Sequence, residues 1–247
     1  MRFIFMEILR NSWFIVKSDF RGDKLRLLWT FLFSILMMGY LAGITGMVVN
    51  EAVGQHERTI VADYLLLTMI PMLGFTFSVR TMKYWSSNSY TKMLAYLRAL
   101  PIPAPVILCK RKIQALISFG LNGTLFFGLM YAISGSLRNE LTGSSYFAFA
   151  LTWVGYGLML TGVYIFIEYL FSGIAYLWLT MLIMVVFFGI TMVIHLAGAN
   201  VLLYSISSSK EWGLLSPLMW GTLLLGTLSV QLFSKWTIYR LKSRDLV

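Results

Sequence analysis

The chain has 247 residues, of which 58% are hydrophobic and only 12% are charged, and its formal net charge is +10. Soluble domains average about 25% charged residues, so this composition excludes a single soluble domain. One cysteine and two histidines are too few for a disulfide framework or a thiolate metal cluster. We therefore expect an all-α, polytopic integral membrane protein with one transmembrane domain over residues 1–247.

Residues 1–26 predict an amphipathic helix that lies in the membrane interface. Glu7, Arg10 and Lys17 fall broadly on one helical face, while Trp13 belongs to the apolar remainder. Charged residues interrupt the first apolar run, so we expect no cleavable signal peptide. Two roles stay open for this segment: a simple cationic anchor, or an elbow helix that moves with the first span.

Six apolar segments are each about 20 residues long, which is enough to cross a hydrocarbon layer of about 30 Å as a helix. They cover residues 27–49, 60–79, 113–133, 146–167, 174–196 and 214–233. The second is the weakest of them, because Asp63 stands near its start and Pro71 lies inside it. We expect Asp63 at the membrane interface and a kink at Pro71.

The cations set the orientation of these spans. With a cytoplasmic N-terminus, seventeen of the twenty Lys and Arg residues lie inside, and only Arg58, Arg138 and Lys210 lie outside. Cations in short loops resist translocation across the membrane. Both termini are therefore expected to be cytoplasmic. The positive charge is expected to face anionic membrane lipids and not nucleic acid.

Gly39 and Gly43 form a small-xxx-small face in the first span, a pattern typical of close helix approach. This face is a candidate dimer contact. Packing within one subunit is an equally open alternative.

The spans hold few ionisable or polar residues. We expect Glu168 to pair with a neighbouring group and His195 to be neutral and locally hydrogen-bonded. Asn122, Gln114 and Gln231 are expected to form hydrogen bonds between helices. No nucleophile and base, paired carboxylates or metal-ligand spacing can be assembled from these residues. The sequence therefore predicts no catalytic, cofactor or metal site.

The segment 80–112 is unusual for a connection between two spans. Its 33 residues include seven cations and no acid. An apolar stripe at helical spacing followed by a proline predicts a short amphipathic helix. Its residues are Tyr90, Met93, Leu94, Leu97 and Pro101, with Arg98 beside the stripe. Binding of lipid headgroups is one interpretation, and docking to a cytoplasmic protein is the favoured one.

The stretch "MLAYLRALPIPAPVIL" and the six-span arrangement resemble the permease subunits of type 2 ATP-binding-cassette (ABC) exporters, the ABC-2 type. The resemblance covers nearly the whole chain. It implies that the apolar stripe and Arg98 form the coupling helix that contacts the ATPase, and that residues 197–213 form short helices in the outer leaflet. It also implies two cytoplasmic ABC ATPase subunits, which bind ATP and Mg, and a second permease, identical or homologous. No G-x-x-x-x-G-K-[ST] loop occurs here, so the ATPase must be a separate chain.

The function expected from these features is export of an amphipathic or hydrophobic substrate, such as a peptide, lipid or drug, across a bacterial plasma membrane. Aromatic side chains are the candidates for the walls of the path: Trp29, Phe33, Tyr40, Phe75, Trp153, Tyr164, Trp178 and Phe187. Two other functions stay open. The chain would then be a non-transporting binding or regulatory subunit, or a membrane-embedded enzyme.

Overall fold

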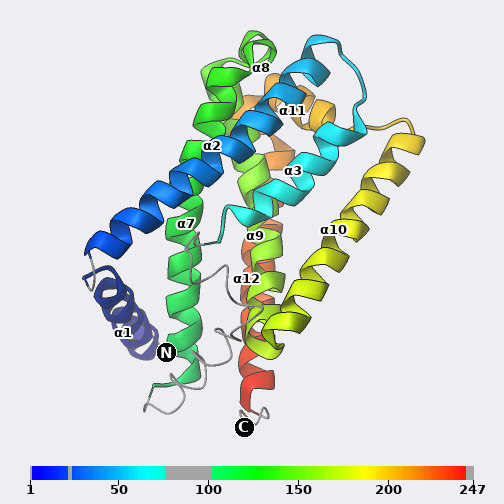
Figure 1. The fold of residues 1–247 in the computed structure, drawn as a ribbon. Coiled ribbons are helices and arrows are strands. Elements are labelled where there is room, and N and C mark those ends of the chain that lie inside the picture. Colours follow the sequence, from blue (N-terminus) through cyan, green and yellow to red (C-terminus); the bar gives the residue numbers. More distant parts are fainter. Residues whose placement is uncertain (1, 22–23, 76–101, 243–247) are drawn as a thin grey trace.

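The computed structural model describes residues 2–21, 24–75 and 102–242, and all regular structure in these ranges is helical. In chain order the elements are α1 (Arg2–Arg21), α2 (Lys24–Gly54), α3 (Ile60–Met72), α7 (Ala104–Ile133), α8 (Gly135–Glu140), α9 (Gly143–Leu170), α10 (Gly173–Leu196), α11 (Val201–Trp212), the 3₁₀ turn η1 (Gly213–Leu215) and α12 (Pro217–Lys242) (Figure 1). The all-α prediction is confirmed over these ranges.

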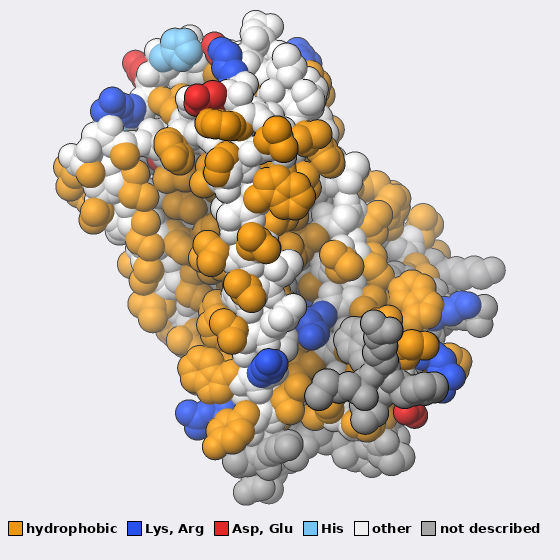
Figure 2. Space-filling view, turned by 180° about the vertical axis from the view of Figure 1, so that it is seen from behind, with side chains coloured by type: hydrophobic (Ala, Val, Ile, Leu, Met, Phe, Trp, Pro, Cys, Tyr) orange, Lys and Arg blue, Asp and Glu red, His pale blue; other side chains and the backbone are white. Residues whose placement is uncertain are grey.

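Five of the described helices are long and apolar enough to cross a membrane, namely α2, α7, α9, α10 and α12. Their apolar parts have 24 to 30 residues. At about 1.5 Å per residue the shortest of them exceeds the roughly 30 Å of a hydrocarbon layer. Figure 2 shows hydrophobic side chains over the middle of one face and charged side chains toward its two ends. Length and composition indicate a membrane-embedded protein.

The second predicted span, 60–79, is not confirmed. Its described part is α3, which has 13 residues and is therefore only about 20 Å long. Pro71 lies in the last turn of α3, and the helix ends one residue later. The expected kink inside a longer helix is therefore not seen. Residues 76–79 lie outside the described residues.

Prolines also set two other helix starts. α7 begins at Ala104, with Pro103 as its N-cap and Pro105 in its first turn. α7 therefore begins before the predicted span 113–133 and is longer than it. α12 begins at Pro217, a few residues later than predicted, because residues 213–215 form η1.

The pair α9 and α12 is the most tightly packed part of the bundle. Glycines allow the two backbones to touch: a Cβ atom on Gly155 would lie 2.6 Å from the backbone of Thr222, and one on Gly226 would collide with the carbonyl oxygen of Gly155. Ser229 Oγ donates a hydrogen bond to the carbonyl of Met159 across the same contact. No side chain separates the helices there.

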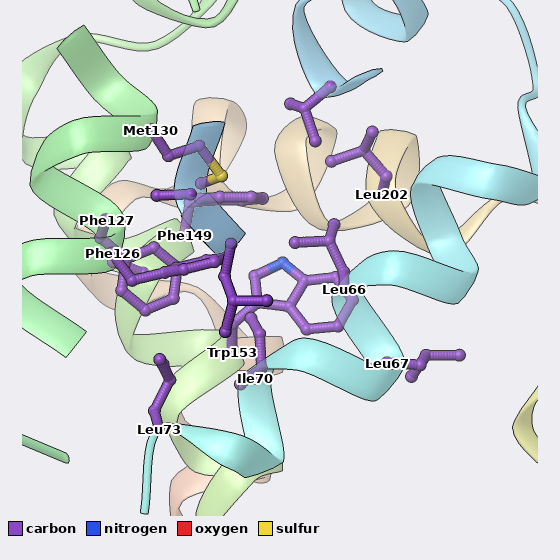
Figure 3. Close-up of a cluster of buried hydrophobic side chains, with 14 of the residues drawn as sticks. Leu66, Leu67, Ile70, Leu73, Phe126, Phe127, Met130, Phe149, Trp153 and Leu202 are labelled. Carbon is purple, nitrogen blue, oxygen red and sulfur yellow. The ribbon is translucent and has the colours of Figure 1, made fainter. Parts of the chain in front are cut away.

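The main hydrophobic core lies between α2, α3, α7 and α9 and reaches α11 (Figure 3). Its largest fully buried side chains include Leu66 and Ile70 from α3 and Phe126 from α7. Phe149 and Trp153 on α9 fill the centre. This core fixes the short helix α3 against the long ones.

α10 is held much more lightly than α9. In the apolar stretch of α9, 61% of the residues are buried, whereas in α10 the share is 11%. In Figure 1 α10 runs along one side of the bundle, with α3 and α9 next to it. Only Gly173, Tyr176, Phe187 and Thr191 of α10 are buried.

Candidate functional site

Three helices meet at the end of the bundle where α7 begins. α1 packs against the first turns of α7, and Ser12 Oγ donates a hydrogen bond to the carbonyl of Val106 at 3.0 Å. Ser12 and Val16 on this face of α1 are completely buried. The sequence did not single out Ser12, because its hydrogen-bond partner Val106 lies 94 residues away along the chain.

The four predicted interfacial residues of α1 lie outside this contact. Glu7, Arg10, Trp13 and Lys17 are all exposed. Trp13 is 52% exposed, next to the buried face of α1. Residues 2–21 form an α-helix, and its amphipathic character and its place in a membrane interface stay predictions.

An ionic contact ties α1 to α7 more firmly. Lys110 Nζ lies 2.8 Å from Asp19 Oδ2, and Gln114 Nε2 donates to the same oxygen at 3.1 Å. Lys110 is 4% exposed, so most of its side chain is covered by protein. The predicted interhelical hydrogen bond of Gln114 is confirmed.

A second ion pair joins α7 to α9. Arg111 Nη2 and Nε each lie 3.0 Å from Glu168 Oε2, and Nε also lies 3.2 Å from Oε1. Both side chains are largely buried, at 12% and 7% exposed. The prediction that Glu168 pairs with a neighbour is confirmed. Such a charge-assisted, fork-like pair holds two helices in a defined register.

A small apolar cluster, separate from the main core, lies at the same end. Ile107 and Leu108 of α7 pack with Ile165 of α9 and Leu241 of α12, and Ile102 packs against them. The last turns of α12, the end of α9 and the start of α7 therefore share one contact region. We call the two ion pairs and this apolar cluster together the α7 platform.

The predicted coupling residues precede the α7 platform in the chain. Tyr90, Met93, Leu94, Leu97, Arg98 and Pro101 lie outside the described residues. The chain becomes described at Ile102, which already contacts the platform. The coupling assignment stays a prediction.

The opposite end of the molecule is joined by polar contacts between short helices. Asn50 Oδ1 at the end of α2 accepts hydrogen bonds from Ser136 N at 2.9 Å and Ser134 Oγ at 3.4 Å. Lys210 on α11 donates to Glu140 on α8 at 2.6 Å. Lys210 holds the pKa of the Glu140 carboxyl below its usual value, by its hydrogen bond and its charge.

Asp63 makes a contact at this end that sequence analysis missed. It is 2% exposed, and its carboxylate accepts hydrogen bonds from the N–H groups of Val201 at 2.9 Å and Leu202 at 2.8 Å. It therefore caps the start of α11, where helix N–H groups have no partner within their own helix. The partners lie 138 and 139 residues away along the chain, so only the isolated carboxylate near the start of an apolar helix was a visible signal.

His195 differs from its prediction. Its Nδ1 atom is buried and has no hydrogen-bond partner among the described residues. The oxygens of nearby Asp63 already accept the N–H groups of α11. The expected local hydrogen bond is therefore wrong for Nδ1. In the part of the chain that the structure describes, no group of three His, Cys, Asp or Glu residues could hold a metal ion.

The two remaining predictions of interhelical hydrogen bonds, for Asn122 and Gln231, have different outcomes. Asn122 Nδ2 donates to the carbonyls of Leu73 and Phe75, both at 3.0 Å, and so holds the end of α3. Gln231 is exposed on α12. Asn122 confirms the prediction for the α3 to α7 contact.

The small-residue face of α2 is open in this chain. A Cβ atom at Gly39 or Gly43 would have nothing within 4 Å, whereas one at Gly46 would touch Ile133 of α7. Packing of Gly39 and Gly43 within one subunit is therefore not seen among the described residues. A dimer contact there stays a prediction.

Aromatic rings form a continuous series through the bundle. In the order Tyr131, Tyr146, Phe149, Trp153, Tyr156 and Phe187, each ring lies 4.6 to 6.4 Å from the next between centroids. Four of the six rings belong to one face of α9, and Phe187 belongs to α10. We call this series the aromatic ladder.

The predicted path residues are not all brought together. Trp153, Tyr164 and Phe187 are buried. Phe75 stacks edge-on against Tyr164 at 5.2 Å. Trp29, Tyr40 and Trp178 are between 65% and 67% exposed, and Phe33 is partly buried against the main core. The aromatic ladder, and not the exposed rings, is the interior candidate for a path.

Comparison of the chain with family models, with curated proteins and with solved structures finds no match.

Proposed function

We propose that this chain is the permease subunit of an ATP-driven exporter that resembles the ABC-2 type. Two such subunits, identical or homologous, would form the transport path, and separate cytoplasmic ATPases would bind ATP and Mg. The chain itself would have no catalytic role. We place it in a bacterial plasma membrane with six spans and both termini in the cytoplasm.

The observation that carries this proposal is the position of the α7 platform. The basic, acid-free segment 80–112 re-enters the bundle there, beside α1 and the last turns of α12. A partner that pushes on residues 90–101 would act on a rigid contact region through a few intervening residues. The two ion pairs would pass that movement to α1 and α9.

Packing supports a movement of this kind. α9 and α12 touch backbone to backbone, so they would move as one body. α10 is largely exposed and would shift more easily against them. Switching between two packings of rigid elements is the common form of alternating access.

The direct test is copurification from native membranes. The chain, carrying an affinity tag, should retain a polypeptide with a nucleotide-binding phosphate loop, and mass spectrometry of the bound chains would identify it. ATP hydrolysis by the purified complex should rise when an amphipathic substrate is added. A complex that holds no nucleotide-binding chain under several mild detergents would contradict the proposal and favour a non-transporting subunit.

A further inference from the structure

Among the described residues, Trp153 is the one member of the aromatic ladder whose polar atom is buried and has no hydrogen-bond partner. The hydroxyls of Tyr146 and Tyr156 donate to the carbonyls of Phe127 and Leu67. The Trp153 side chain is 2% exposed, and its Nε1–H has no acceptor among the described residues. An indole N–H can only donate, so nothing else satisfies it.

The surroundings of this N–H are apolar. Figure 3 shows the indole in the core with Leu66 and Ile70 of α3 beside it and Leu202 of α11 nearby. A buried donor without an acceptor costs free energy, whereas a phenylalanine would fill much of the same space without that cost. If packing were its only role, a tryptophan here would make the folded chain less stable than a phenylalanine would.

The position of Trp153 gives a ligand a route to it. The ladder passes from Trp153 through Tyr156, at 5.8 Å between centroids, to Phe187 on α10, at 6.3 Å. α10 meets the bundle through few buried residues, and Phe187 is one of them. Movement of α10 away from α9 would uncover this end of the ladder first.

The charges around this route restrict the ligand. α3, α9 and α10 contain no Lys or Arg, and His195 in the last turn of α10 is the one side chain on these helices that could become cationic, so they offer a phosphate or carboxylate no permanent positive charge. Ring faces and aliphatic side chains suit an apolar chain or flat apolar body. The free N–H of Trp153 suits one neutral oxygen acceptor, such as an ester or amide carbonyl.

We propose that Trp153 is a cargo-binding residue between α3, α9 and α10, and that its indole N–H donates to the carbonyl of a neutral amphipathic cargo. This inference rests on the proposed transport function and names the substrate class of that path. The site is closed in the conformation described here and opens when α10 moves. The aromatic ladder supplies the apolar walls, and Trp153 supplies the specificity.

The test uses two neutral probes that differ in one group. 1-Monolauroylglycerol carries an ester carbonyl, and 1-O-dodecylglycerol has an ether in its place. Binding of each radiolabelled probe is measured on the full chain in lipid nanodiscs, without the ATPase. The variant Trp153→Phe removes the N–H and keeps an aromatic ring, and Trp212→Phe, at a position 53% exposed on α11, is the matched control.

We expect wild type to prefer the ester over the ether. Trp153→Phe should weaken ester binding about tenfold and leave ether binding unchanged, because one hydrogen bond is lost. Trp212→Phe should change neither. Equal loss of both probes would assign Trp153 a packing role and overturn the proposal, as would unchanged ester binding or no binding of the ester to wild type.

A second measurement tests the proposal even if the Trp153→Phe variant misfolds. In the protein labelled with 5-fluorotryptophan, the ¹⁹F signal that disappears in Trp153→Phe should shift on addition of the ester and not of the ether. No shift of that signal would also overturn the proposal. Since neither experiment contains the ATPase, their result is independent of whether the chain binds one.

Discussion

Two helices of similar apolar character have opposite surroundings in this protein. α9 is packed on several sides, with α12 in backbone contact, whereas only four of the 24 residues of α10 are buried. Glycines at the α9 to α12 contact allow this closeness, and branched or aromatic side chains on α10 face outward. The comparison shows that one chain combines a rigid pair with a lightly held helix, which is what a moving path requires.

The largest effect is expected where α9 is tied to α7. Arg111→Met leaves the Glu168 carboxylate, 7% exposed, without its partner. Breaking a buried ion pair from one side costs about 3–5 kcal/mol of stability. The double variant Arg111→Met with Glu168→Gln should recover much of that loss. Thermal unfolding of the purified chain in detergent gives both values, and a single variant that unfolds at the wild-type temperature would show that the pair carries no stability.

The next largest effect concerns the α9 to α12 contact itself. Gly226→Ala places a methyl group against the Gly155 carbonyl, so we expect a loss of about 1–3 kcal/mol from overpacking. Gly221→Ala is the matched control on the same helix, because its Cβ would have nothing within 4 Å. It should be neutral or stabilise by up to about 1 kcal/mol through helix propensity. Equal melting temperatures for the two variants would contradict the close packing.

Sequence analysis predicted the presence of the five long apolar helices better than their ends or their surroundings. The amide of Asn122 was informative because a polar group in a span needs a partner. α9 and α10 could not be distinguished, because lipid-facing and protein-facing positions are both apolar. Hydrophobicity therefore does not separate a packed helix from an exposed one.

The polar contacts of the candidate sites were harder to predict. Glu168 was expected to have a partner, but Arg111 lies 57 residues away and only the folded chain brings it close. The same holds for Asp63 and the start of α11. The free N–H of Trp153 had no signal at all, because an aromatic residue in a span is ordinary core composition.

A moderate effect is expected at the contact between α3 and α11. Asp63→Ala removes the carboxylate that accepts the Val201 and Leu202 N–H groups, leaves the N-cap Asn200 in place, and should cost about 0.5–2 kcal/mol. The change should be local, with faster hydrogen exchange of the Val201 and Leu202 amides. Val61→Ala, on an exposed position of α3, is the control. Unchanged exchange at both amides in Asp63→Ala would show that the cap does not hold α11.

The smallest effect is expected on α10. Val185 is 66% exposed, so Val185→Ala should change the stability of the isolated chain by no more than about 0.5 kcal/mol. Phe187→Ala, at a buried position two residues later, should cost several times more. A large loss from Val185→Ala would mean that α10 is covered in the purified protein, for example by a second copy of the chain.

The central claim, that residues 90–101 couple this chain to an ATPase, is tested most directly by pull-down of the ATPase with two variants. Leu97→Asp puts an unpaired charge into the predicted apolar contact and should cost about 2–4 kcal/mol, a roughly thirtyfold to thousandfold loss of affinity. Lys92→Ala removes a charge beside the apolar stripe and should have a much smaller effect. Both variants must insert into the membrane as wild type does. Loss of the ATPase with Leu97→Asp alone is the predicted result, and full retention of the ATPase by Leu97→Asp would contradict the coupling assignment.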